Sequence, residues 1–381
     1  MMTRLGDVCT VISGSTPKTS VAEYWDGDIK WITPAELNED SFYLYDSQRH
    51  ITELGKEKTG LSYMPIGTVI LSSRAPIGKT AIAGCEMCCN QGFKNLICSD
   101  DIFNEYLYYF LKGKTDYLNS LGRGATFKEI SKSIVENIEI RLPALEEQKQ
   151  IARQFGEIYR LISLRKQQLA RLDELVKARF VELFGDTILN PFGWKKDLLG
   201  TVCDVRDGTH DSPQYYESGY PLVTSKNVTG GKIDLTDCSL ICEADFKKIN
   251  ERSKVDIGDI IMPMIGTVGK PVIVDIEPNF AIKNVSLIKF KADSRVLNTY
   301  IRALLQSDYF DDAVLSKVRG GTQKFISLGD IRKLEVLVPP MELQEQFATF
   351  IKQTDKSKLA VQQSLDKLEL LKKALMQKYF G

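Results

Sequence analysis

The sequence predicts an α+β fold in which two pseudo-symmetric mixed α/β heads are joined by two long helices that form an antiparallel coiled coil. The main observation is a duplication: residues 125–185 match residues 321–381 without a gap, and both copies end in Phe-Gly. A weaker echo lies upstream, where Leu5-Gly6 returns as Leu199-Gly200. Because this repeat is far longer than a solenoid unit, we interpret it as a duplicated module. A pseudo-symmetric binding protein implies a target with two related sites.

The first head is predicted to span residues 1–142 and to mix strand and helix. Gly67 to Leu71 has the pattern of a turn that enters a buried strand, and Glu105 to Lys112 has the pattern of a helix. Glycine-rich loops precede the last element of each head, at Leu121 to Gly124 and at Val318 to Gly321. These patterns indicate an α+β head without predicting the order of its strands.

The first long helix is predicted within residues 143–185. Pro143 supplies a start signal, and Glu146-Glu147 favour the positive end of the helix dipole. Apolar residues then follow an alternating four-three spacing that only Arg165 and Arg179 interrupt. The series is Ile151, Phe155, Ile158, Ile162, Leu169, Leu172, Val176 and Leu183. A heptad seam of about five repeats is typical of a coiled coil.

The second half repeats this order, with a head at residues 186–338 and a long helix at residues 339–381. Gly258 to Met262 is the predicted strand, and Asn298 to Gln306 is the predicted helix. The second heptad series is weaker and consists of Phe347, Ile351, Val361, Leu365, Leu368, Leu375 and Tyr379. Because the first helix runs from one head into the other and the second helix ends the chain, their pairing must be antiparallel. About 40 helical residues at roughly 1.5 Å each would separate the heads by on the order of 60 Å.

The composition is that of a soluble globular protein with room for two domains. Of its 381 residues, 43% are apolar and 26% are charged. There is no apolar run long enough to span a membrane and no signal-peptide pattern, so we expect a cytoplasmic protein. The eight cysteines lack paired metal-ligand spacing, which favours buried thiols over a metal site, and no motif predicts a cofactor. Fifty basic residues balance fifty acidic ones, so net charge alone would not hold DNA tightly.

Four segments stand in an order that is specific to one family of proteins. The first head opens with Ser13-Gly14-Ser15-Thr16-Pro17 followed by Trp31-Ile32-Thr33-Pro34, and the second with Asp207-Gly208-Thr209-His210. Leu142 to Gln148 and Val338 to Gln344 lead into the two long helices. Each segment alone is only moderately specific, but all four in this order within a tandem duplication are highly specific. Over essentially its whole length, the chain resembles the specificity subunit of type I restriction-modification systems.

This resemblance implies a DNA-reading subunit that is not an enzyme. In that family each head is a target-recognition domain that reads one half of a bipartite double-stranded DNA site, and the paired helices space the halves. Two methyltransferase subunits dock on the helical regions, and a restriction and translocase subunit can join them. One departure concerns docking, because Leu343 and Glu345 stand where the first copy has Glu147 and Lys149.

Cationic and amide side chains at turns are the candidate DNA contacts. Arginine and lysine bind guanine edges or phosphates, and asparagine binds adenine. In the first head these residues are Arg74, Lys79, Lys94, Asn95, Arg123 and Lys128. In the second head they are Lys226, Asn227, Lys270, Lys283, Asn284, Arg319 and Lys324. The repeated placement of Lys94-Asn95 and Lys283-Asn284 raises these two pairs above the rest. Any single cation could equally be a solvated surface charge, and a buried asparagine that satisfies a turn would also repeat.

Motifs that would indicate catalysis are incomplete. Ile77-Gly78-Lys79-Thr80 ends like a phosphate-binding loop but has Ser73 where that motif requires glycine. Asn190-Pro191-Phe192 lacks the second proline of an amino-methyltransferase loop and is adequately explained as a turn. The only histidines are His50 and His210, and His210 is better placed to cap a turn or to meet a phosphate or a base.

Two other classes of function compete with DNA reading. One is a tethering protein whose coiled coil joins two protein-binding heads, and nothing in the sequence excludes it. The other is a fused restriction-methyltransferase, which the missing catalytic motifs exclude. Co-purification with an adenine methyltransferase and methylation of a split DNA motif would separate DNA reading from tethering.

Overall fold

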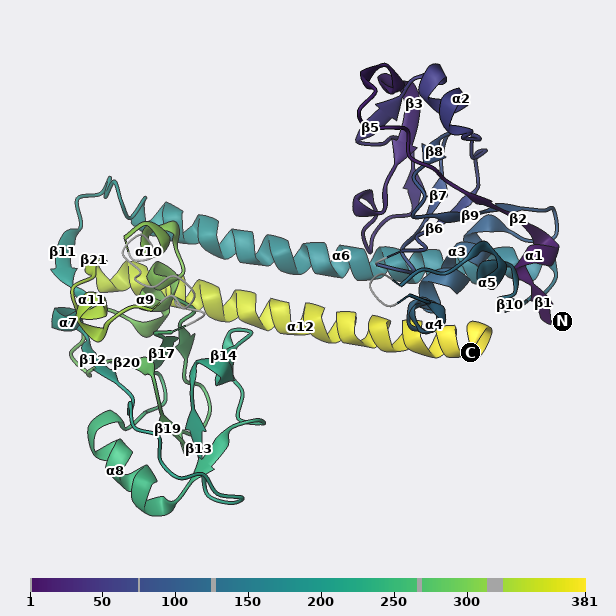
Figure 1. Cartoon of the computed structure of the whole chain (residues 1–381). Helices are drawn as coiled ribbons and strands as arrows, with labels where there is room; N and C mark the ends of the chain where they lie inside the picture. Colours follow the sequence, from purple (N-terminus) through teal and green to yellow (C-terminus); the bar gives the residue numbers. More distant parts are fainter. Residues whose placement is uncertain (1, 75, 125–127, 266–268, 314–324) are drawn as a thin grey trace. The chain divides into compact units, whose positions relative to one another are not determined.

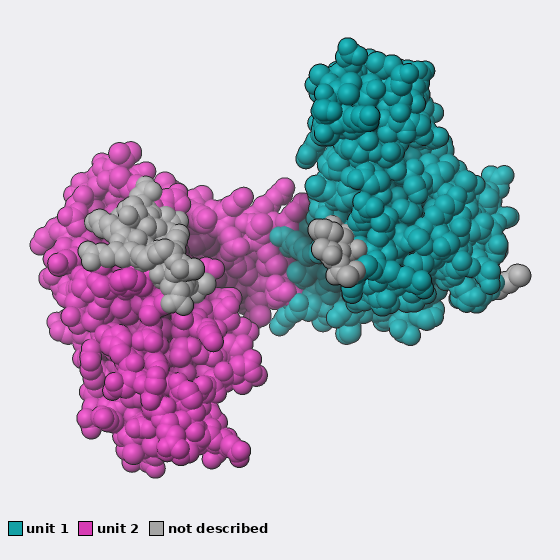
Figure 2. All heavy atoms as spheres, in the orientation of Figure 1, with its two compact units in different colours: residues 1–166, 363–381 teal, residues 167–362 magenta. Residues whose placement is uncertain are grey.

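Each head folds together with one half of both long helices. In this computed structural model, unit 1 consists of residues 1–166 and 363–381, and unit 2 consists of residues 167–362 (Figure 2). The structure describes residues 2–74, 76–124, 128–265, 269–313 and 325–381.

Two sheets and a short ribbon form the head of unit 1, with the orders β2-β9-β6-β7-β4, β5-β3-β8 and β1-β10 (Figure 1). The strands are β1 (Met2–Arg4), β2 (Cys9–Ser13), β3 (Trp25–Ile32), β4 (Tyr43–Leu44), β5 (Arg49–Ile51), β6 (Val69–Leu71), β7 (Thr80–Ala83), β8 (Cys88–Cys89), β9 (Lys94–Cys98) and β10 (Glu139–Arg141). The helices are α1 (Leu5–Val8), α2 (Glu53–Thr59), α3 (Asn104–Gly113), α4 (Thr115–Leu121) and α5 (Lys132–Glu136). Short 3-10 turns are η1 (Ala22–Tyr24) and η2 (Pro34–Glu36).

The head of unit 2 repeats most of this topology, with the sheets β12-β20-β17-β18 and β16-β13-β19 and the ribbons β11-β21 and β14-β15. Its strands are β11 (Lys195–Leu198), β12 (Asp204–Asp207), β13 (Tyr220–Val223), β14 (Val228–Thr229), β15 (Lys232–Ile233), β16 (Ser239–Ile241), β17 (Ile260–Pro263), β18 (Val272–Ile273), β19 (Ala281–Ile282), β20 (Val285–Lys289) and β21 (Glu335–Val338). Its helices are α7 (Leu199–Val202), α8 (Glu243–Ser253), α9 (Asn298–Leu305), α10 (Asp308–Ala313) and α11 (Leu328–Arg332), with the 3-10 turn η3 (Ser225–Asn227).

The strands and helices predicted from the sequence in the two heads are confirmed. β6 and β17 are central strands of equivalent sheets, and their residues are buried on both faces, which explains their continuous apolar runs. In the smaller sheets, β3 and β13 each pair antiparallel with one neighbour and parallel with the other. The α3 and α9 helices also occupy equivalent places in sequence. The α+β assignment and the pseudo-symmetry of the heads therefore hold.

Two helices of 40 residues each, α6 (Leu145–Phe184) and α12 (Met341–Phe380), are also confirmed (Figure 1). In unit 1, the Arg165 Nε donates a hydrogen bond of 3.1 Å to the Ser364 hydroxyl, while Phe155 stacks on Phe380. In unit 2, Lys358 forms a 2.6 Å ion pair with Asp173. Partner numbers fall along α12 as they rise along α6, so the pairing is antiparallel within each unit.

Aromatic residues at the helix ends belong to the cores of the heads, which the heptad series did not predict. Phe380 lies in the main core of unit 1, and its ring centroid is 5.4 Å from that of Phe155. In unit 2 the rings of Phe180 and Phe184 pack against Phe347 at 5.5 and 5.4 Å. The predicted seam residue Leu183 is only partly buried. Both long helices therefore contribute side chains to the core of each head.

A buried glutamine near the start of each long helix attaches it to its head. The Gln148 Nε2 donates to the carbonyl oxygens of Asp101 and Pro143, both at 2.9 Å, and its Oε1 accepts from the Phe103 amide at 2.8 Å. Gln344 makes the same three bonds in unit 2, to Arg295, Pro339 and Leu297. Both side chains are fully buried, and these three bonds satisfy the hydrogen-bonding groups of each buried amide.

Candidate nucleic-acid interface

Four of the predicted contacts in the first head gather around one carboxylate, Glu129. The Arg74 Nε lies 2.8 Å from the Glu129 Oε2, and the Lys94 Nζ lies 3.2 Å from its Oε1. Backbone bonds of 3.0 and 2.9 Å pair Arg123 with Glu129, and the exposed Lys128 precedes Glu129 in the chain. The loops after β6 and after α4 thus present Arg74, Arg123 and Lys128 on one surface of the head.

Glu129 neutralises part of this positive charge. Partial burial by itself raises the pKa of the Glu129 carboxyl, but the hydrogen bonds from Arg74 and Lys94 outweigh burial and leave its pKa below the usual value. The carboxylate is therefore ionised at neutral pH and orients both cations. Arg74 keeps about half of its side chain exposed, 47%, whereas Lys94 keeps 9%. Arg74 can thus reach a phosphate or a base, while Lys94 mainly anchors Glu129.

Two predicted contacts in the first head have structural roles instead. The Asn95 side chain is fully buried and donates a 3.0 Å hydrogen bond to the Cys89 sulfur, so the prediction that it contacts DNA is wrong. The half-buried Lys79 donates to the carbonyl oxygens of Pro34 and Leu37, at 3.2 and 2.6 Å. That ammonium holds the turn η2 in place.

The second head keeps its exposed cations on separate loops. Lys226 in η3 and Lys270 before β18 are exposed. Asn227 is buried, and its Oδ1 accepts hydrogen bonds of 3.0 Å from the Thr224 amide and hydroxyl. Glu36 caps the equivalent turn of the first head through Thr33, so Asn227 is a turn-forming residue rather than a base contact. Arg319 and Lys324 lie outside the described residues.

Lys283 and Asn284 are not the structural equivalents of Lys94 and Asn95. Lys94 is in β9, opposite Ser13, whereas Lys283 and Asn284 lie in the connection between β19 and β20. The equivalent of Lys94 is Ser286 of β20, which pairs with Asp207 at the end of β12 as Lys94 pairs with Ser13 at the end of β2. The two Lys-Asn pairs therefore occupy different positions in their heads, and their repetition in the sequence does not reflect structural equivalence.

The β19–β20 connection of the second head meets the loop after β12. The Lys283 Nζ donates a 2.6 Å hydrogen bond to the Ser212 hydroxyl. His210 lies between Asp207 and Asn284, with each ring nitrogen 2.9 Å from a side-chain oxygen. The buried Asp207 also pairs with Arg252 from the end of α8. In the first head the corresponding loops meet through a hydrogen bond from the Thr16 hydroxyl to Gln91.

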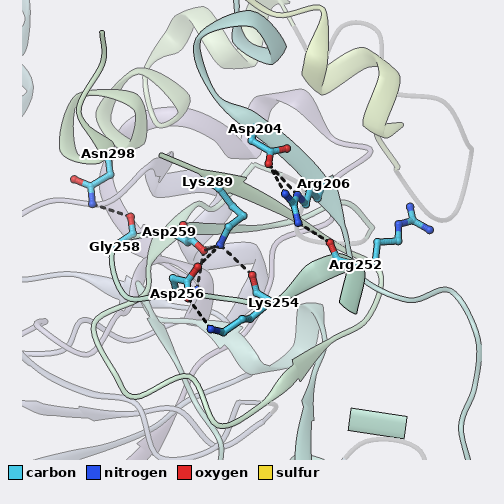
Figure 3. A network of polar contacts seen from close by, with 9 residues as sticks. All are labelled: Asp204, Arg206, Arg252, Lys254, Asp256, Gly258, Asp259, Lys289 and Asn298. Carbon is cyan, nitrogen blue, oxygen red and sulfur yellow. Dashed lines mark hydrogen bonds and ion pairs between the residues drawn. The ribbon is translucent and has the colours of Figure 1, made fainter. Parts of the chain in front are cut away.

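A polar network beneath this surface holds the end of α8 in place (Figure 3). The Arg206 Nη1 donates a 2.9 Å bond to the Arg252 carbonyl oxygen, and Asp204 holds the same guanidinium at 2.6 Å. Beside it, the Lys289 Nζ lies 2.7 Å from Asp256 and 2.6 Å from Asp259. Burial raises the pKa of Asp259, although Lys289 opposes that effect. The network fixes the backbone from which Arg252 reaches Asp207.

Both surfaces also contain acidic residues, which were not predicted from the sequence. Glu129 and Asp207 carry no attraction for DNA, yet they orient Arg74 in one head and His210 and Arg252 in the other. Asp207 stood in the sequence within the quoted Asp-Gly-Thr-His segment, which was the one available signal for it. Nothing in the local sequence marked Glu129.

A cleft lies between head and helices in each unit, and equivalent segments line the two clefts. The cleft of unit 1 has a volume of about 480 Å³ and is lined by Lys79 and Glu369, among others. The cleft of unit 2 has a volume of about 630 Å³ and is lined by the duplicated positions Lys270 and Asp173. Lys112 also lines the first cleft, and burial lowers its pKa to about 8.

All eight cysteines are free thiols, four of them buried. No three side chains able to ligate a metal come together within the described ranges. Among the described helices, none has the length and hydropathy needed to cross a lipid bilayer.

The chain is similar in sequence to proteins of one family. The profile described as "Type I restriction modification DNA specificity domain" matches residues 1–174 and 191–370. The type I restriction enzyme MjaIX specificity subunit of Methanocaldococcus jannaschii is 32% identical over 98% of this chain and 91% of its own length. The EcoKI specificity subunit of Escherichia coli K12 is 22% identical over 98% of this chain and 86% of its own length.

Two solved structures share the fold. The S subunit of a type I restriction-modification system from M. genitalium matches with a TM-score of 0.59 at 14% identity, covering 100% of this chain and 96% of that one. A chain from a study of complex assembly and conformational transition of the type I R-M system matches with a TM-score of 0.61 at 19% identity. It covers 100% of this chain and 97% of its own length.

Proposed function

Because this chain belongs to the family of type I restriction-modification DNA specificity subunits, we propose that each of its heads reads one half of a bipartite double-stranded DNA site. The observation that carries this proposal is that the two heads share the core of their sheet topology but differ in the loops at equivalent places. Thr16 and Gln91 meet in the first head, and His210 and Asn284 meet in the second. A common scaffold with different loop chemistry suits two half-sites of different sequence.

The recognition domains in this proposal are residues 1–142 and 186–338, and the helical spacers are residues 143–185 and 339–381. In the first head, Arg74, Arg123 and Lys128 are the exposed candidate contacts. In the second head the candidate contacts are the exposed Lys226 and Lys270 and the half-buried Lys283 and Asn284. Arginine and lysine at such loops bind phosphates and position the protein, and a smaller number of side chains read base edges.

The paired helices set the spacing of the two half-sites and carry two methyltransferase subunits. Support for two docking positions comes from the two clefts, because equivalent segments of head and helix line both. Their charges differ, since Tyr159 in the first cleft corresponds to Asp355 in the second. The methyltransferases supply the catalysis, a restriction and translocase subunit joins the same complex, and this activity takes place in the cytoplasm.

Exchanging one head tests the proposal. Residues 1–142 are replaced by the first head of another specificity subunit, and the chimaera is produced in cells together with the cognate methyltransferase subunit. Sequencing of methylated bases should show a motif in which one half has changed while the other half and the gap are kept. A change in both halves would contradict independent heads.

The parent chain serves as the control in the same cells. It should direct methylation of a bipartite motif only when the methyltransferase is present. If the parent co-purifies with other proteins but directs no methylation with its methyltransferase, the tethering function is favoured and the DNA-reading function is refuted.

A further inference from the structure

In the second head, each ring nitrogen of His210 faces a side-chain oxygen. Its Nε2 lies 2.9 Å from the Asp207 Oδ2, and its Nδ1 lies 2.9 Å from the Asn284 Oδ1. A carboxylate oxygen and an amide oxygen both accept, and only the doubly protonated imidazolium donates from both nitrogens. With the Asn284 oxygen turned toward the ring, this arrangement requires a doubly protonated, charged His210.

Asn284 is well placed to be read by a ligand. It lies in the connection between β19 and β20 with φ at +55°, a left-handed conformation that asparagine tolerates better than most residues. Its side chain is half-exposed, and its Oδ1 is occupied by His210. None of the described residues accepts a hydrogen bond from its Nδ2. The amide N–H groups are thus the part of Asn284 that is left for DNA.

Deprotonation of His210 would change which hydrogen-bonding group Asn284 offers to DNA. Neutral His210 keeps its one N–H on Nε2, because Asp207 can only accept, and Nδ1 then becomes an acceptor. The nearest group able to donate to that nitrogen is the Asn284 amide after a half-turn about its last torsion. The Asn284 Oδ1 would then face outward. The charge on His210 therefore decides whether Asn284 offers a donor or an acceptor.

We propose that His210 is a positioning residue that makes Asn284 a donor-only reader of one base in the half-site of the second head. This inference rests on the proposed function. In the major groove, guanine offers N7 and O6, adenine offers N7 and thymine offers O4 as acceptors, whereas cytosine offers only its N4 donor. The second head therefore rejects cytosine at one position and accepts the other three bases there.

The charges around His210 set the pH range of this selectivity. Asp207 on β12 faces the ring, Arg252 at the end of α8 approaches the same carboxylate, and Asp211 and Lys283 adjoin His210 and Asn284 in sequence. The bonds to Asn284 and Asp207 raise the pKa of His210 above its usual value, while partial burial and Arg252 oppose them. His210 is fully protonated at low pH and loses its charge as the pH rises through this raised pKa. Selectivity against cytosine should therefore weaken at alkaline pH.

The test measures methylation rates of the complex reconstituted with its methyltransferase subunits. The substrates are duplexes in which every position of both half-sites carries each of the four bases. At pH 6.0 the wild-type complex should methylate the cytosine substrate at one second-head position roughly tenfold more slowly than the other three, in line with one lost base contact. At pH 9.0 this ratio should shrink, while the ratios for the first half-site, which serve as the internal reference, should not change.

Asn284→Asp replaces the donors by a second acceptor and should make cytosine acceptable at that same position. Asn279→Asp makes the same chemical change on an exposed asparagine before β19 and is the matched control, expected to keep the wild-type pattern. His210→Phe should reduce the discrimination against cytosine at that position without creating a preference for cytosine. The inference is overturned if Asn284→Asp changes no base preference, or if the wild-type ratios are the same at both pH values. Failure of the wild-type complex to methylate any bipartite site would instead refute the proposed function.

Discussion

At the scale of single residues, the buried glutamines Gln148 and Gln344 show how one side chain can attach a helix to a domain. Each is fully buried and makes three hydrogen bonds to backbone groups. The net gain from a satisfied hydrogen bond is modest, but leaving a buried partner unsatisfied costs about 1–3 kcal/mol. The cost of leaving their backbone partners unsatisfied therefore exceeds the net stability that their hydrogen bonds contribute.

Gln148→Leu should destabilise unit 1 by about 1–3 kcal/mol, because the Phe103 amide and two carbonyl groups lose their partner. Gln150→Leu, on the exposed side of the same helix turn, is the matched control and should change stability by less than about 0.5 kcal/mol. Hydrogen exchange along α6 reports the difference. Equal protection from exchange in the two variants would show that the hydrogen bonds of Gln148 do not stabilise unit 1.

At the scale of secondary-structure elements, each long helix serves in both units. The first part of α6 and the last part of α12 pack in the core of unit 1, and the remaining parts pack in the core of unit 2. Stacked and edge-on aromatic pairs at these places contribute about 0.5–1.5 kcal/mol beyond the area that they bury. The C-terminal residues of the chain are thus part of the core of the N-terminal head.

Phe380→Ala should destabilise unit 1 by about 3 kcal/mol and leave unit 2 nearly unchanged, since removing a buried aromatic ring leaves a cavity. Leu370→Ala removes an apolar side chain that is 69% exposed on the same helix and should have little effect. Hydrogen exchange resolved by unit is the measurement. A loss of protection in unit 2 alone would contradict the assignment of Phe380 to the core of unit 1.

At the scale of the whole molecule, the two long helices are proposed to act as a ruler. Each is continuous over 40 residues, and the pairing of Arg165 with Ser364 and of Asp173 with Lys358 defines matched segments. A heptad deletion keeps the a and d positions in register, so removal of seven residues from both helices should preserve their pairing.

Deleting residues 166–172 together with residues 358–364 shortens each helix by roughly 10 Å at about 1.5 Å per residue. At about 3.4 Å per base pair, the preferred gap between half-sites should shrink by on the order of three base pairs. Some affinity should be lost as well, because one half-site turns by about a third of a helical turn relative to the other. The gap in the methylated motif is the measurement, and an unchanged gap would mean that the helices serve only as a docking platform.

Much of the candidate site could be predicted from residue type at turns, but not all of it. Arg74, Arg123 and Lys128 were predicted as contacts and are exposed together around Glu129. Asn95 was predicted by the same rule and lies in the core. A turn pattern in the sequence does not say which face of the turn the protein covers, so residue type alone cannot separate these two cases.

The sequence by itself determined the duplication, the two long antiparallel helices, the α+β heads and the family, because each depends on periodicity, connectivity or short segments in a fixed order. Only the tertiary structure decided the strand order, the shared aromatic cores, the register difference between Lys94 and Lys283, and the placing of His210 between Asp207 and Asn284. The physical reason is the same in each case. Burial and hydrogen bonding depend on contacts between residues far apart in the chain, and local patterns do not contain those contacts.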